Sequence, residues 1–206
     1  MFFYSEVKRR YMMQHVKPEL RSRIIEVAFR EFDEKGYEGA SMRSIAEGAG
    51  TSLGNLYRYF KNKDDMYASC LVPVLDDCIL WTGRVFDVSE RAIDLTARNM
   101  AHYVGQHSRE FSIIVRGPAK HYTEFRERFT ECIANKLEQH AREIGCASAK
   151  NPDFFNSIAI GFISGLRVIL ENSHSEQDTA SYIRELMHFL FSDFDKRLSQ
   201  LKGEAE

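Results

Sequence analysis

The sequence lacks most of the residue patterns that mark a metal site, a disulfide framework or a catalytic centre. Its four cysteines form no C-x-x-C pair and keep no regular spacing, which favours reduced thiols in a bacterial cytoplasm. No two of its seven histidines stand four residues apart on one predicted helix face, and no phosphate loop, nucleophile elbow or dinucleotide fingerprint occurs. We therefore predict no metal, no cofactor and no enzymatic activity.

Long hydrophobic runs are also missing. The longest apolar stretch without a charge covers residues 154–166, which is 13 residues, whereas a helix needs about 20 residues to cross a bilayer. At the N-terminus, Met1-Phe2-Phe3-Tyr4 is followed by Glu6 and by Lys8-Arg9-Arg10, so no secretory signal is expected. With 44% hydrophobic and 28% charged residues, the composition is typical of a folded chain without a membrane span.

The formal net charge of −2 hides an uneven distribution. Residues 1–23 carry six Lys or Arg against two acidic residues, and residues 41–63 carry four against one. Residues 71–206 hold 16 basic and 20 acidic residues. A single basic cluster is most often solvated surface, but two clusters flanking one motif favour a partner that carries phosphates.

Apolar residues at helical spacing predict an all-α fold. An apolar face recurs from residue 21 to 35, and Gly36 is expected to end that helix in a left-handed conformation. Ser41, Ser52 and Asn62 are favoured N-caps for three further helices, and Pro73 is expected to kink or restart the last of these. A later helix is expected over 89–107, and a shorter one follows it and ends at residue 117. Further helices are expected over 125–144, 154–170 and 182–201.

The segment 41–60 has the layout of a helix-turn-helix, in which a glycine-containing turn joins two short helices. The apolar seam expected between these helices consists of Ile45, Ala46, Ala49 and Leu56. With that seam buried, the opening turn of the second helix stays outward, where it can enter a DNA major groove.

That outward turn and its neighbours offer the chemistry that reads and grips DNA. Asn55 suits adenine, and Arg43 suits guanine or a phosphate. Gly54 in a helix interior costs roughly 1 kcal/mol relative to Ala, which favours a close backbone approach to another surface. Lys63 opposes the dipole of the helix that it begins, unless a phosphate docks there. Hydroxyl groups suited to phosphates come from Ser52, Tyr57 and Tyr59, although half-buried packing is the simpler interpretation of either tyrosine alone.

In this region the sequence resembles the tetracycline-repressor (TetR) family of bacterial regulators. The resemblance covers roughly residues 18–78 and rests on Ile24-Ile25-x-x-Ala28-x-x-x-Phe32-x-x-x-Gly36-Tyr37, Ile45-Ala46-x-x-Ala49-Gly50 and Leu56-Tyr57-x-x-Phe60-x-x-Lys63. It implies a three-helix DNA-binding domain over 18–78, and over 79–206 a helical bundle for ligand binding and dimerisation. It also implies a cytoplasmic homodimer on a near-palindromic operator, with DNA contacts from Arg43, Ser52, Leu53, Gly54, Asn55, Tyr57, Tyr59 and Lys63.

Two of these positions depart from the family pattern. Tyr59 stands where the family often has histidine. Leu53 stands where it often has lysine or another polar residue, so contact with a thymine methyl is expected there in place of direct base reading.

The second domain is expected to hold a small-molecule effector that is apolar or aromatic and has a polar group. The expected lining consists of Trp81, Phe86, His102, Tyr103, Phe111, Tyr122, Phe125, Phe129 and Phe155; the alternative is a filled aromatic core. Effector binding is expected to move the helix that begins after Asn62 and to release a repressor from its operator.

The two C-terminal helices carry more apolar surface than one chain needs to bury. Residues 154–170 are apolar nearly all round, and 182–201 carry a continuous apolar stripe. We predict that the segments of about 152–172 and 179–201 form half of an intermolecular four-helix bundle in a two-fold homodimer. Gly161-x-x-x-Gly165 permits a close helix approach, and packing within one chain is a nearly equal alternative.

Two other classes of protein are compatible with parts of this sequence. A helical enzyme would assemble its site from scattered acids and histidines, but no constellation of them is visible. A helical scaffold protein would explain the amphipathic helices, but it leaves the basic, capped and outward helix start unexplained.

Overall fold

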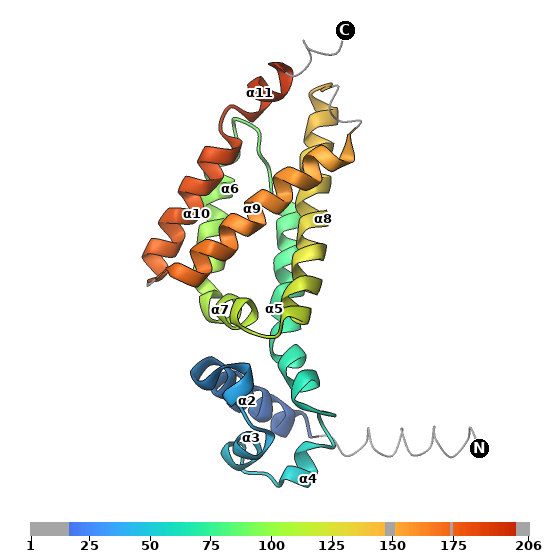
Figure 1. Ribbon diagram of the computed structural model, residues 1–206, viewed down its shortest axis with the longest axis vertical. Coiled ribbons are helices and arrows are strands. Elements are labelled where there is room, and N and C mark those ends of the chain that lie inside the picture. The colour runs from blue at the N-terminus through green and yellow to red at the C-terminus, as the bar shows by residue number, and fades with distance from the viewer. Residues whose placement is uncertain (1–16, 147–150, 174, 201–206) are drawn as a thin grey trace, which may run out of the picture. The chain divides into compact units, whose positions relative to one another are not determined.

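The computed structural model describes residues 17–146, 151–173 and 175–200, and within these ranges the chain forms helices and no strand (Figure 1). The all-α prediction is thereby confirmed. The basic cluster Lys8-Arg9-Arg10 lies outside the described residues. The chain divides into two compact units between Pro73 and Val74.

The first unit contains helices α2 (Pro18–Gly39), α3 (Met42–Gly48) and α4 (Leu53–Leu56) and the beginning of α5 (Lys63–Val85). One face of α2 buries Ile24, Ala28 and Phe32, which is the face that the apolar spacing predicts. Gly36 has the expected positive φ of 68°, but the helix bends there and ends at Gly39.

Side-chain caps hold the starts of these helices. The Ser41 hydroxyl accepts a hydrogen bond from the Ser44 amide at 3.0 Å, and the Ser52 hydroxyl accepts one from the Asn55 amide at 3.1 Å. The Asn62 side chain accepts from the Asp65 amide at 2.8 Å, and the Asp65 carboxylate accepts in return from the Lys61 amide at 2.8 Å. Two otherwise unpaired amide groups are thus satisfied at the start of α5.

Three predicted helices have different limits in the structure. The helix that begins after Ser52 ends at Leu56, because the chain continues through turns at residues 57–59. Helix α5 runs through Pro73 without a restart. The predicted helix over 182–201 is split into α10 (Glu176–Phe191) and α11 (Phe194–Gln200), since Asp193 adopts a left-handed φ of 55°.

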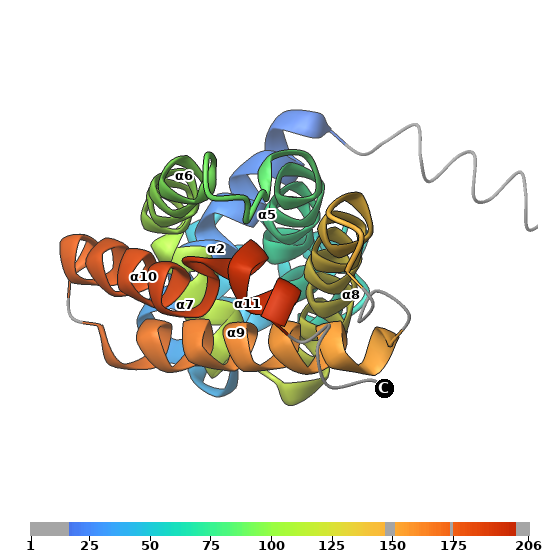
Figure 2. The same ribbon diagram turned by 90° about the horizontal axis from the view of Figure 1, so that it is seen from above.

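The second unit contains the rest of α5, α6 (Ile93–Gln106), α7 (Ser108–Arg116), α8 (Ala119–Glu143), α9 (Pro152–Asn172), α10 and α11. Helix α10 packs on α6 and on α9, and α9 also packs on α8 and α7 (Figures 1 and 2). Phe86, Phe162 and Phe191 form an aromatic cluster in this core, with ring centroids 5.5–6.2 Å apart.

All four cysteines are free thiols. Cys70, Cys78 and Cys146 are buried, and Cys132 is half-buried. Burial raises the pKa of Cys70 and of Cys78 to about 12, and it also raises that of Cys132.

Helix α9 is the one segment of the described chain that is long and apolar enough to cross a membrane by length and composition, over Asp153–Asn172. Its inner face is covered by protein, because Phe155, Ala159 and Phe162 are at most 1% exposed. Its outer face carries the Arg167–Glu171 ion pair at 2.8 Å. Both features are those of a packed helix in a bundle and differ from a lipid-exposed one.

Two glycines of the first unit make a matched test of this packing. A Cβ on Gly48 would lie 2.8 Å from Cγ1 of Val27, a short branch that has little room to move, whereas a Cβ on Gly54 would meet nothing within 4 Å. We expect Gly48→Ala to lower the free energy of unfolding by about 1–3 kcal/mol through overpacking. Gly54→Ala is expected to leave it unchanged or to raise it. Urea unfolding followed by circular dichroism measures both, and equal stability of the two variants would contradict the close approach of α3 to α2.

Candidate nucleic-acid interface and ligand cavity

The helix-turn-helix is held by the predicted apolar seam. Ile45, Ala46, Ala49 and Leu56 are all at most 1% exposed, and α3 packs on both α2 and α4. The Arg23 guanidinium donates to the carbonyl of Ala49 at 2.9 Å, which ties the turn after α3 to α2. The crossing of α3 and α4 is therefore fixed from inside the unit.

Several of the predicted DNA-contacting residues lie on the outside of this seam. These exposed residues include Ser52, Leu53, Gly54 and Tyr57. The single buried residue of α4 is Leu56, which directly precedes Tyr57. The space around Gly54 is open, so nothing within the chain accounts for a glycine there.

Arg43 is the most accessible of the predicted base-reading residues. Its side chain is 82% exposed and pairs at 3.0 Å with Glu47, one turn further along α3, which is itself 68% exposed. An ion pair with so little burial contributes little to stability. The guanidinium of Arg43 can therefore leave Glu47 for another anion with only a small loss of free energy.

Asn55 and Tyr59 are engaged within the chain. The side-chain amide nitrogen of Asn55 donates to the Thr51 hydroxyl at 2.8 Å. This bond orients the Asn55 side chain and does not use its amide oxygen. The Tyr59 hydroxyl accepts from the Lys17 amide at 3.1 Å, at the start of α2. Each retains part of its hydrogen-bonding capacity for a nucleic acid.

Lys63 requires a correction to the argument from the helix dipole. Its ammonium donates to the carbonyls of Tyr37, Glu38 and Ala40 at 2.6, 3.3 and 3.2 Å and lies 4.5 Å from the centre of the Tyr37 ring. These carbonyls have no partner within a helix that ends at Gly39. The cation at the start of α5 is therefore explained by the end of α2, and all three ammonium hydrogens are used.

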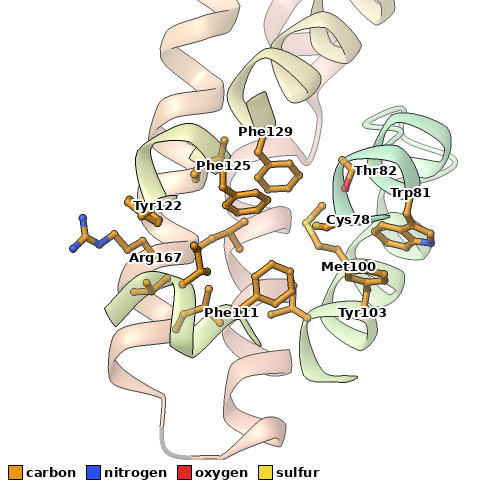
Figure 3. Close-up of a pocket in the computed structure, with 16 residues that line it drawn as sticks. Cys78, Trp81, Thr82, Met100, Tyr103, Phe111, Tyr122, Phe125, Phe129 and Arg167 are labelled. Atoms are coloured by element: carbon orange, nitrogen blue, oxygen red, sulfur yellow. The ribbon is translucent and has the colours of Figure 1, made fainter. Parts of the chain in front are cut away.

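The second unit contains an apolar cavity between α5, α6, α7, α8 and α9 (Figure 3). It has about 540 Å³ of space free of atoms, including the part that opens to solvent. Six of the nine predicted residues line it, namely Trp81, Tyr103, Phe111, Tyr122, Phe125 and Phe129. Trp81 stacks on Tyr103 at 4.8 Å between ring centroids, and Phe125 stacks on Phe129 at 5.4 Å.

Three predicted residues do not line this cavity. Phe86 belongs to the cluster with Phe162 and Phe191, and Phe155 is 1% exposed and packs against Phe154. His102 is exposed on α6. Phe155 and His102 lie on α9 and α6, whose rotation turns them toward the core and the solvent, whereas Phe86 comes directly after the last residue of α5.

Further lining residues were not predicted from the sequence. Most are aliphatic or small side chains on the same five helices: Cys78, Thr82, Met100, Val104, Ile114, Val115, Ile163, Leu166, Arg167 and Leu170. The expectation that effector pockets are aromatic drew attention away from them. For Ile163 and Leu166, the apolar pattern of residues 154–170 was the signal in the sequence that could have identified them.

The polar groups at the cavity have unequal partners. The Tyr103 hydroxyl donates to the Asp77 carboxylate at 3.0 Å, and burial followed by this hydrogen bond raises the pKa of Tyr103. The Arg167 guanidinium lies 4.8 Å from the centre of the Tyr122 ring and bonds Glu171 at 2.8 Å. The hydroxyl of Thr82 is fully buried, and among the described residues only the weakly bonding thiol of Cys78 lies close to it.

Nothing in the described ranges resembles a metal centre: no three His, Cys, Asp or Glu side chains there are grouped to hold an ion.

These features define an all-helical protein with an N-terminal helix-turn-helix and a C-terminal bundle that encloses an apolar cavity. Comparison with known proteins agrees with that class. The sequence model described as "Bacterial regulatory proteins, tetR family" matches residues 24–70. Over residues 24–70 the chain is therefore similar to the tetR family of bacterial regulatory proteins.

Curated relatives match over a stretch of similar length. An HTH-type transcriptional regulator of Staphylococcus aureus (strain USA300) is 50% identical over 48 residues, which are 23% of this chain. The chain thus aligns with about a quarter (26%) of the length of that relative.

Solved structures show that the fold extends beyond the helix-turn-helix. The fatty acid degradation regulator FadR from Bacillus halodurans is similar with a TM-score of 0.65 and 17% identity, over 85% of this chain and 96% of that one. A TetR-like transcriptional regulator from Rhodococcus sp. RHA1 is similar with a TM-score of 0.61 and 18% identity, over 86% and 98%. At these identities the similarity concerns the fold.

The carbonyl contacts of Lys63 are testable through stability. We expect Lys63→Met to lower the free energy of unfolding by about 1–2 kcal/mol, because partly buried carbonyls lose their donor. Lys61→Met, which changes an exposed lysine two residues earlier, serves as the control and is expected to have little effect. Urea unfolding measures both, and a Lys63→Met protein as stable as the control would contradict the structural role.

Proposed function

We propose that this chain is a cytoplasmic DNA-binding transcription regulator of bacteria, which acts as a repressor and releases a near-palindromic operator when a small molecule binds its second unit. The observation that carries the proposal is the exposed start of α4, set at a fixed angle by a buried seam inside a domain that matches the tetR family. A helix start presented in this way is how helix-turn-helix proteins read base edges in the major groove.

The proposed contacts divide into two kinds. Arg43 and Asn55 are assigned to bases, Gly54 to close backbone approach, and Leu53, which is 39% exposed, to a thymine methyl. The hydroxyls of Ser52, Tyr57 and Tyr59 are assigned to phosphates. Lys63 remains a proposed phosphate contact, and in that role it would have to exchange at least one of its three carbonyl partners.

Dimerisation is proposed through the outer faces of α9 and α10. The outer face of α9 is small or apolar at Ser157, Ile160, Gly161, Ser164 and Val168, and the Arg167–Glu171 ion pair lies toward its C-terminal end. On α10, Phe189 is 82% exposed, which is an unusual position for phenylalanine in a monomer. A second copy related by a two-fold axis would cover both faces and would present two helix-turn-helix units to one palindromic site.

The two glycines of the Gly161-x-x-x-Gly165 motif face different surroundings. A Cβ on Gly165 would lie 2.9 Å from a Cδ of Leu186 on α10, whereas one on Gly161 would meet nothing within 4 Å. Gly165 therefore serves packing within one chain. Gly161 lies on the face proposed for the dimer.

Base reading is tested by selecting bound fragments from random DNA with the wild-type chain. We expect a site with two related half-sites. Arg43→Ala and Asn55→Ala should each reduce the preference for that site over unrelated DNA by about 5–100-fold, because one good base contact is worth about 1–3 kcal/mol of discrimination. Fluorescence anisotropy at fixed salt measures this preference.

The control is Arg98→Ala, which removes an exposed arginine from α6 in the second unit. It should leave the preference unchanged. If the wild-type chain selected no common sequence, or if both variants kept the full preference, the proposed reading head would be wrong.

Dimerisation is tested with a charge on the exposed phenylalanine. We expect Phe189→Glu to convert a dimer into a folded monomer, since a desolvated carboxylate at the centre of an apolar interface is strongly unfavourable. Leu95→Glu is the matched control, because Leu95 is also an exposed apolar residue, 54% exposed, but lies on α6. Sedimentation analysis distinguishes the two states, and dimers of equal strength in both variants would argue against this interface.

A further inference from the structure

The cavity of the second unit has one polar group that its own chain leaves unsatisfied. Thr82 is fully buried on α5 and lines the cavity, and its hydroxyl meets none of the described hydrogen-bonding groups in bonding geometry. The thiol of Cys78 lies one turn earlier. The nearby hydroxyl of Thr82 offsets part of the rise that burial causes in the pKa of this thiol, but a thiol is a weak hydrogen-bond partner. A hydroxyl buried without a strong partner is unfavourable unless something else binds it.

Two other polar side chains at the cavity already have partners. The Tyr103 hydroxyl donates to Asp77, and the Arg167 guanidinium is held by Glu171 and by the Tyr122 ring. Figure 3 shows the Arg167 guanidinium pointing past Tyr122, away from the labelled residues that surround the cavity. No charge is therefore directed into the interior, so an ionised ligand would lose its hydration without compensation.

The remaining walls favour a flat apolar molecule. Figure 3 shows Thr82 and Cys78 on α5 on one side, with the rings of Phe125 and Phe129 facing them and Phe111 completing the wall. Aromatic rings placed around a cavity favour stacked or edge contacts with another ring.

We infer that the cavity binds an uncharged aromatic molecule with a hydroxyl or carbonyl oxygen, which forms a hydrogen bond with the buried hydroxyl of Thr82. This inference rests on the proposed function, since it names the chemical class of the effector. Thr82 acts as the specificity-determining residue: it accepts from a ligand hydroxyl or donates to a ligand carbonyl. The rings supply affinity, and the hydroxyl selects oxygen-bearing ligands over hydrocarbons of the same shape.

The test uses three probes of similar size: 4-propylphenol, propylbenzene and the anion 3-phenylpropionate. Trp81 is the only tryptophan of the chain and lines the cavity, so its fluorescence reports binding directly, and calorimetry provides an independent value. Wild type should bind 4-propylphenol most tightly. In Thr82→Val, which keeps the shape and removes the hydroxyl, the preference for 4-propylphenol over propylbenzene should fall about fivefold to tenfold, as expected for one neutral hydrogen bond.

Thr96→Val is the matched control. Thr96 is also a buried threonine, but its hydroxyl donates to the Val85 carbonyl at 3.4 Å and it does not line the cavity. It should keep the wild-type ligand preference. Thr82→Val should melt at the same temperature as wild type or higher, because the hydroxyl that it removes has no strong partner in the chain.

The outcomes separate this inference from the proposed function. It is overturned if no probe binds, if 3-phenylpropionate binds more tightly than 4-propylphenol, or if Thr82→Val keeps the full preference for the phenol. DNA binding of the same wild-type preparation is measured in parallel. Intact selection of DNA together with any of these results would remove the ligand assignment alone, whereas probe binding without DNA selection would remove the regulator assignment.

Discussion

The small apolar seam beneath the helix-turn-helix is the constraint on which the proposed function depends. Because Ile45, Ala46 and Leu56 are almost completely buried within the first unit, the outer residues of α4 have a defined direction. Gly48 allows α3 to approach Val27 more closely than any other residue would. The four-residue helix α4 would be marginal in isolation, so its conformation comes from this packing and from the Ser52 cap.

Local signals in the sequence predicted the helix starts well. Ser41, Ser52 and Asn62 cap helices in the structure as expected, because a cap depends on residues only two or three positions away. Helix ends were predicted less accurately. The apolar stripe of the last helix continues through Asp193, and the periodicity alone gave no reason to divide α10 from α11.

The parts of the site that depend on distant residues were not accessible from the sequence. Lys63 was interpreted through its own helix, whereas its partners are carbonyls more than twenty positions earlier. His102 lies on the predicted helix but on its solvent-exposed face, and Phe86 lies beyond the end of α5. Thr82 was overlooked, because a hydroxyl without a partner is a property of the folded chain that no residue pattern reveals.

The burial of the cysteines limits which chemical signals could act on their thiols. Oxidants and electrophiles attack the thiolate, and at Cys70, Cys78 and Cys132 burial raises the pKa and so keeps the sulfur protonated. Cys146 is buried as well. None of the four cysteines therefore offers an exposed thiolate for oxidants or electrophiles. The proposed effector switch would then depend on reversible binding, without covalent modification of a cysteine.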